Sequence, residues 1–169
     1  MKFSTDQDIL AFAEKIRKKW KAFHDPDHQV APYFMRMGYL KRALYGFANA
    51  CLDQEKSVLL HKVAKSNVRH YRPSKELKDN PYFAAICLVL NGVSKFPKNA
   101  KHQIPRELYY ARKHGVPKEY LIGFLMQSGG YDRLIDNLRT GKMEGWWVRN
   151  KKRTALLPNP RHPERSSTD

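Results

Sequence analysis

The sequence predicts an all-α protein: a compact bundle of about six short-to-medium helices, followed by a flexible basic C-terminal tail. Three observations predict this class. Apolar residues recur at spacings of three and four, no alternating run is bounded by hairpin turns, and Pro or Gly marks most segment ends. The 169 residues, 41% hydrophobic, suit one domain with a real core. We expect a helical domain at 1–148 and a basic, Pro-rich flexible tail at 149–169.

The first predicted helix has the clearest pattern. Thr5 can cap its N-terminus, with Asp8 three residues later in place of the usual Glu. Segment 24–28 ends the helix. Its apolar stripe consists of Ile9, Phe12, Ala13, Ile16, Trp20 and Phe23.

Further helices are predicted along the rest of the domain. Pro32 suits the first turn of one helix, Pro73 stops the next, and Asn91 with Gly92 closes a short apolar one. Residues 93–104 are predicted to be a lysine-rich loop. The expected helical ranges are 32–53, 54–70, 81–90, 105–113, 117–127 and 131–138.

Charge is the outlying feature of the composition. Lys and Arg number 32 against 16 Asp and Glu, a formal net charge of +16. Such an imbalance destabilises a compact fold by self-repulsion, so it usually reflects an anionic partner. The candidates are DNA or RNA, an anionic membrane and an acidic protein; the alternative is a protein that is merely basic. The balance favours nucleic acid, alone or within a larger nucleoprotein complex.

Two features argue against a membrane or secretory role. The longest apolar stretch, 82–90, is far too short to span a bilayer. No charged-then-apolar leader opens the sequence. Cys51 and Cys87 stand in apolar, helix-like stretches typical of a core. We expect a cytoplasmic protein that has no membrane partner.

The predicted nucleic-acid contacts are cations in basic segments, joined by two tryptophans. Lys and Arg neutralise phosphates and release counterions, which makes binding strongly dependent on salt. Exposed aromatic rings could stack on unpaired bases. The predicted contacts are Lys15, Lys18, Lys19, Lys62, Lys65, Arg69, Lys98, Lys101, Arg112, Lys118, Trp146, Trp147, Arg149, Lys151, Lys152 and Arg153.

Residues 107–126 match a helix-turn-helix pattern. Ala111 supplies the small residue of the first helix, Gly115 the turn, and Leu121 an apolar anchor. The outward positions of the second helix include Ile122 and Met126, which suit packing better than base reading. The other interpretation is therefore two core helices joined by a glycine turn. The pattern slightly favours DNA and a regulatory or accessory role.

Three other functions remain open. The chain could be an RNA-binding subunit of a ribonucleoprotein or effector complex, with its tail ordering on RNA. It could be a metal-dependent nucleic-acid-processing enzyme built on His24, Asp25, Asp27 and His28, although these residues also suit a helix end. It could also be an adaptor for an acidic protein. We assign no catalytic residue, metal ligand or cofactor.

Overall fold

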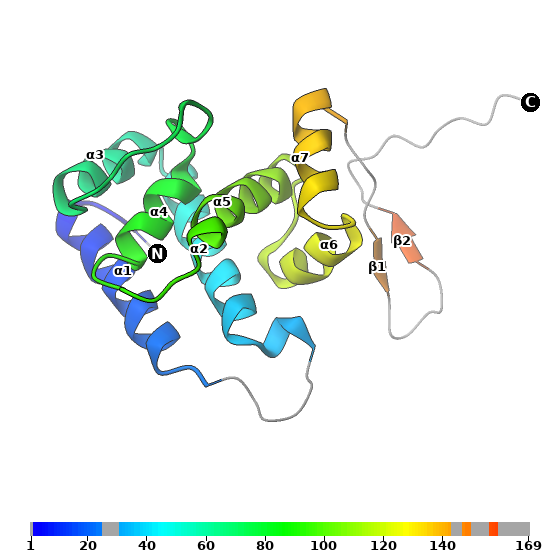
Figure 1. The fold of residues 1–169 in the computed structure, drawn as a ribbon, viewed down its shortest axis with the longest axis horizontal. Coiled ribbons are helices and arrows are strands. Elements are labelled where there is room, and N and C mark those ends of the chain that lie inside the picture. The colour runs from blue at the N-terminus through cyan, green and yellow to red at the C-terminus, as the bar shows by residue number, and fades with distance from the viewer. Residues whose placement is uncertain (1, 25–30, 143–146, 150–155, 159–169) are drawn as a thin grey trace, which may run out of the picture.

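The computed structural model describes residues 2–24, 31–142, 147–149 and 156–158. The predicted all-α class is confirmed (Figure 1). The helices are α1 (Asp6–Lys21), α2 (Arg36–Leu52), α3 (Ser57–Asn67), α4 (Pro81–Val89), α5 (Lys98–Lys113), α6 (Leu121–Gln127) and α7 (Tyr131–Thr140). Three 3-10 turns join them, namely η1 (Pro32–Phe34), η2 (Lys75–Leu77) and η3 (Lys118–Tyr120).

Two short strands are the only β-structure in the described residues. β1 (Trp147–Arg149) and β2 (Leu156–Pro158) pair antiparallel, with Trp147 opposite Pro158. Most of the predicted flexible tail lies outside the described residues.

Helix α4 is the centre of the bundle. Each of its residues is buried, and it packs against α1, α2, α3 and α5 (Figure 1). A helix that is apolar on every side must be covered on every side, which explains this position. The buried Asn80 caps it, since its side-chain oxygen accepts hydrogen bonds from the N–H groups of Tyr82 and Phe83.

Helix α1 confirms the first predicted helix. The Thr5 hydroxyl accepts from the Asp8 N–H at 3.2 Å, and the Asp8 carboxylate accepts from the Thr5 N–H at 2.8 Å. The backbone N–H groups of Thr5 and Ser4 both donate to the Asp8 carboxylate and hold its pKa below its ordinary value. Ile9, Ala13, Ile16 and Trp20 are buried, so the predicted apolar stripe faces the core and the lysines face outward.

The predicted helix at 32–53 is two elements rather than one. Met35 has extended backbone and separates η1 from α2. The turn folds back onto α2, where a Cβ added to Gly38 would lie 2.1 Å from the Pro32 carbonyl oxygen. Glycine therefore permits this close approach. The next predicted helix, 54–70, is also shorter, because Glu55 has a left-handed φ of 57° before α3.

The predicted loop at 93–104 is wrong over its second half, because α5 already begins at Lys98. Pro105 lies inside this helix instead of starting it. Burial explains the extension: Ile104, Leu108 and Ala111 form one buried stripe that continues across the proline. Proline removes one backbone donor, and the helix keeps the apolar contacts on both sides of it.

The predicted helix at 117–127 is two elements, because η3 precedes α6 and α6 begins only at Leu121. Helix α7 begins at the predicted residue and extends two residues beyond the predicted end at 138. Gly141 follows α7 with a left-handed φ of 69°, a backbone conformation that favours glycine at a helix end. Among the described residues, the helices are too short or too polar to cross a bilayer.

Candidate nucleic-acid interface

A groove between α1 and α2 gathers cations from three elements. Its volume is about 410 Å³. Four of its lining side chains are cationic: Lys15 and Lys19 from α1, Arg42 from α2, and Lys118 from η3. The other lining residues are Phe12, Ile16, Tyr39, Ala43, Gly46 and Phe47, so the described lining contains no carboxylate. We call this site the α1–α2 groove.

Helical spacing places the α1 cations at this groove. Lys15 and Lys19 are four residues apart, so they lie one turn apart on the same face. Lys118 comes from a distant part of the chain. Its Nζ and Cδ atoms lie 3.2 Å and 3.4 Å from the point where a Cβ on Gly46 would stand. The missing side chain of Gly46 therefore leaves room for the stem of Lys118.

Contacts with η1 and with its own helix α2 hold the side chain of Arg42 in place. Its guanidinium lies 3.6 Å from the centre of the Tyr33 ring. Its Nε donates to the Gly38 carbonyl at 3.2 Å, and its Nη2 donates to the Tyr33 carbonyl at 2.9 Å. Within the described residues, its Nη1 group has no hydrogen-bond partner. This arrangement leaves a fixed cationic donor at the edge of the groove.

The four groove cations form no ion pair with any described residue. Several of the described carboxylates pair with cations elsewhere in the fold. Glu107 pairs with Lys41 at 2.5 Å, Glu76 with Arg106 at 2.6 Å, and Asp53 with Arg112 at 2.8 Å. Glu14 likewise pairs with Arg17, beside the groove helix but away from its lining. The groove is therefore a concentrated positive site without an internal counter-charge.

Aromatic rings form much of the groove wall. Phe12 packs against the buried Phe47 with ring centroids 5.3 Å apart. Tyr39 stacks on Phe23 at 5.7 Å. Burial raises the pKa of the Tyr39 hydroxyl, while the charge of Arg42 acts in the opposite direction. Tyr39 is therefore neutral at physiological pH and adds no negative charge to the groove.

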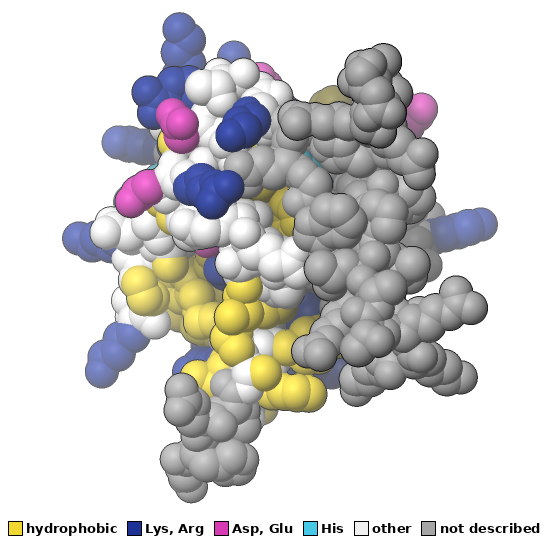
Figure 2. Space-filling view, turned by 90° about the vertical axis from the view of Figure 1, so that its right-hand side faces the viewer, with side chains coloured by type: hydrophobic (Ala, Val, Ile, Leu, Met, Phe, Trp, Pro, Cys, Tyr) yellow, Lys and Arg dark blue, Asp and Glu magenta, His cyan; other side chains and the backbone are white. Residues whose placement is uncertain are grey.

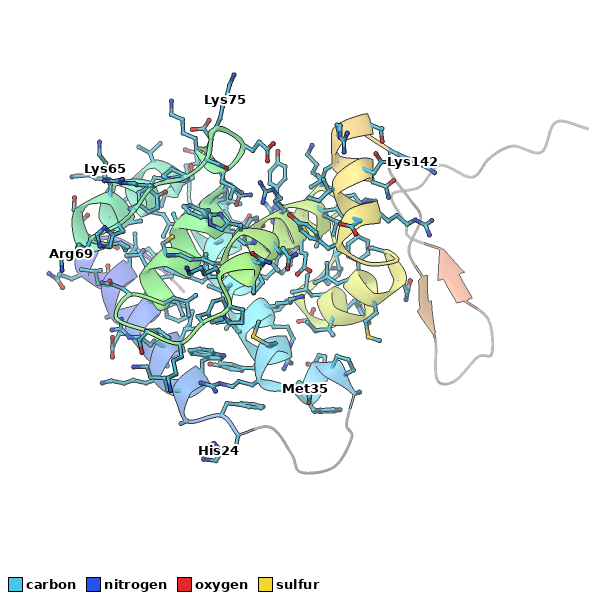
Figure 3. The ribbon with its side chains drawn as sticks, in the orientation of Figure 1. His24, Met35, Lys65, Arg69, Lys75 and Lys142 are labelled. Carbon is cyan, nitrogen blue, oxygen red and sulfur yellow. The ribbon has the colours of Figure 1, made fainter. Side chains whose placement is uncertain are left out.

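The predicted α3 contacts lie in a different depression. Lys62 and Lys65 line a hollow of about 730 Å³ that Asp79 also lines. Its other lining residues include Lys78 and His61, whose Nδ1 lies 2.7 Å from the Tyr71 hydroxyl. Burial lowers the pKa of His61. Figure 3 shows Lys65 and Arg69 at the α3 end of the molecule, opposite His24 and Met35.

The remaining predicted contacts are dispersed. Lys98 and Lys101 lie in the first turn of α5, where positive charge opposes the helix dipole. Arg112 pairs with Asp53, and Lys18 is exposed on α1 outside the groove lining. Trp147 and Arg149 belong to β1. The predicted contacts outside the described residues are Trp146, Lys151, Lys152 and Arg153.

Sequence reasoning found three of the groove cations and missed Arg42. Lys15, Lys19 and Lys118 were predicted from separate basic stretches, and the fold brings them together. A signal for Arg42 exists in the sequence. It stands four residues after Gly38 and four before Gly46, which is the spacing of one helix stripe.

The helix-turn-helix pattern corresponds to a turn between α5 and α6. Gly115 has a left-handed φ of 63°, and Leu121, Ile122 and Phe124 are buried. The exposed positions of the seven-residue α6 are Gly123, Met126 and Gln127. Gln127 carries the one polar side chain among these three positions.

The hypothesis of a metal site at 24–28 depends mostly on residues outside the described part of the structure. His24 is exposed at the end of the first segment, whereas Asp25, Asp27 and His28 are not described. Elsewhere in the described ranges, no cluster of three or more His, Cys, Asp or Glu side chains forms. Cys51 and Cys87 are buried, and burial raises the pKa of their thiols to about 12 and about 11. Their predicted core positions are confirmed.

An apolar area lies where η1 and η3 pack against α6. Phe34, Tyr120 and Met126 are 60%, 45% and 62% exposed. Figure 2 shows hydrophobic side chains gathered on this side of the molecule, below cationic ones.

Comparison of the chain with protein-family models, with curated proteins and with solved structures found no match.

Proposed function

We propose that this chain is a non-enzymatic nucleic-acid-binding protein that holds phosphates in the α1–α2 groove. One observation supports the proposal most strongly. Four cationic side chains from three elements converge there, and none of them pairs with a described carboxylate. Such a cluster repels itself until an anion neutralises it.

A polyanion explains the surplus charge better than a single small anion. The groove accounts for four cations, whereas the formal net charge of the chain is +16. Lys18 extends the basic face of α1 beyond the groove. A nucleic acid carries a phosphate at every nucleotide, so it could contact the groove and its surroundings at once. DNA or RNA is therefore the proposed partner, in a regulatory or accessory role.

The proposed binding mode gives affinity rather than sequence selection. Arginine and lysine contacts to phosphates carry no base information. The exposed face of α6 presents mainly Gly123 and Met126, so we assign no base-reading role to that helix.

A salt titration tests the proposal. The affinity of the purified protein for a labelled oligonucleotide would be measured by fluorescence anisotropy over a range of NaCl concentrations. With four phosphates neutralised, we expect a log–log slope of roughly −3 to −4. Failure to bind either DNA or RNA at low salt would overturn the proposal. Binding that does not depend on salt would overturn the phosphate mechanism.

A further inference from the structure

We infer that the α1–α2 groove receives an unpaired nucleotide, so that the protein selects single-stranded over double-stranded nucleic acid. The inference rests on the proposed function and adds the form of the ligand. It follows from the size of the groove, its aromatic lining and the position of its cations.

The groove has the size of a small-ligand site. Its volume of about 410 Å³ lies at the lower end of the range typical of pockets that enclose small organic molecules. A duplex keeps its bases stacked in the interior and offers only its backbone and groove edges to such a hollow. A single strand can turn one base outward, and a nucleotide then fits within the walls.

The lining combines two chemistries that a nucleotide also combines. Aromatic side chains from both helices, Phe12 and Tyr39, are half-buried and line the interior. The cations Lys15, Lys19 and Arg42 approach from the same two helices. A base has apolar faces that suit aromatic walls, and its phosphate suits the cations. Binding a duplex backbone would use the cations alone, and the parts of the aromatic rings that face the groove would contact no ligand.

Arg42 supplies a donor whose position is already determined. The Tyr33 ring and two carbonyl groups hold its guanidinium, and its Nη1 group remains available among the described residues. A donor that is already ordered loses little conformational entropy when it binds a phosphate oxygen. The stem of Lys118 lies close over Gly46, so a second cation reaches the same hollow.

Gly46 allows the hollow to be filled without changing any charge. A leucine at this helical position would place its side chain where Lys118 and the proposed nucleotide meet. The matched control is Gly123→Leu on α6, another helical glycine, whose added Cβ would contact nothing within 4 Å. Both substitutions replace a helical glycine with a better helix former.

The experiment compares three labelled probes at equal salt: a thymidine homopolymer, a uridine homopolymer and a mixed-sequence DNA duplex. We expect the wild type to bind at least one single strand roughly tenfold more tightly than the duplex. Gly46→Leu should remove most of that preference: single-strand affinity should fall about tenfold, whereas duplex affinity should fall far less, only through the displacement of Lys118. Gly123→Leu should behave as the wild type does. Tighter binding of either the thymidine or the uridine homopolymer than of the duplex satisfies the inference.

Equal affinity of the wild type for all three probes would overturn the inference and leave the proposed function intact. Equal weakening of duplex and single-strand binding by Gly46→Leu would also overturn the inference and leave the proposed function intact. Absence of binding to every probe would instead overturn the proposed function. If Gly46→Leu fails to fold, the wild type with a 2-aminopurine strand decides the question. Emission quenched further by the protein supports base insertion, and unchanged emission contradicts it.

Discussion

Two hollows of similar size show how this fold distributes its charge. The α1–α2 groove measures about 410 Å³, and a second pocket between η2, α5 and α7 measures about 440 Å³. Both are lined by several cations. In the second, which we call the α5–α7 pocket, Arg106 donates to Glu76 at 2.6 Å and to the Tyr131 hydroxyl at 3.3 Å. Asp79 adds another carboxylate to its lining.

The difference lies in where the few carboxylates stand. In the α5–α7 pocket, Arg106 connects η2 and α7 through Glu76 and Tyr131, so its charge is used within the fold. In the α1–α2 groove the cations lack such a partner among the described residues. A basic residue is therefore a weak indicator of binding by itself. A cationic cluster that the fold leaves without counter-charge is a stronger one.

The largest predicted effect is a loss of nucleic-acid affinity, and it distinguishes charge reversal in the groove from charge reversal on α3. Lys15→Glu with Lys19→Glu should weaken nucleic-acid binding by roughly 100-fold at moderate salt, because two phosphate contacts become repulsive. Lys62→Glu with Lys65→Glu changes the net charge equally, yet should weaken binding only several-fold through the long-range field. Anisotropy titrations measure both. Equal losses would show that diffuse charge, not the groove, governs affinity.

The next prediction concerns Gly38 of α2. Gly38→Ala should destabilise the protein by about 1–3 kcal/mol, because its Cβ would stand 2.1 Å from the Pro32 carbonyl oxygen and displace η1. Arg42 would then lose the ring and carbonyl of Tyr33, so binding should weaken as well. Chemical denaturation and anisotropy measure the two effects.

Gly123→Ala is the control for that stability change. Its Cβ meets open space, so alanine should stabilise α6 by up to about 1 kcal/mol. The two glycine substitutions therefore have opposite predicted signs. A stabilised Gly38→Ala variant would contradict the close approach of η1 to α2.

A smaller effect is expected from Arg42→Lys. The charge remains, but the planar donor over Tyr33 is lost, so affinity should fall by roughly three- to tenfold with nearly the same salt slope. Arg36→Lys is the matched control, because Arg36 also lies over an aromatic ring, Trp20, at 4.1 Å but outside the groove lining. Similar losses for both variants would mean that Arg42 acts through stability alone.

The sequence predicted those features that depend on nearby residues. The Thr5–Asp8 cap and the apolar stripe of α1 involve residues three or four positions apart, so periodicity reveals them. The start of α5 was missed because Pro105 locally favours a helix beginning. The burial of Ile104 and Leu108 in the bundle outweighs that preference.

The groove itself could be predicted only in part. Lys15, Lys19 and Lys118 were found from basic character, but no local pattern shows that Lys118 lies over Gly46 on α2. Arg42 was missed because its role depends on η1 folding back onto α2. The separation of Lys62 and Lys65 from the groove likewise follows from the packing of α3 against α4. The gathering of these cations in one groove depends on the tertiary structure, so the amino-acid composition cannot predict it.

The smallest predicted effect tests the other side of the comparison, the internally paired charge of the α5–α7 pocket. The hydrogen bond from Arg106 and its positive charge lower the pKa of Glu76 below its ordinary value of 4.5. Folding therefore favours the ionised carboxylate, and this stabilisation is present above pH 4.5 and is lost as the pH falls through the lower folded value.

Glu76→Gln should consequently lower the Tm slightly at neutral pH, and the difference from the wild type should disappear on acidification. Comparing variant with wild type cancels the titration of Asp8, whose pKa is also lowered. Nucleic-acid affinity should stay almost unchanged, because Glu76 neutralises Arg106 far from the α1–α2 groove lining. A large gain in affinity would show that Arg106, released from its carboxylate, can bind phosphate. The two hollows would then differ in phosphate binding only because the cations of one are paired with carboxylates, and the shape of each hollow would contribute little to affinity.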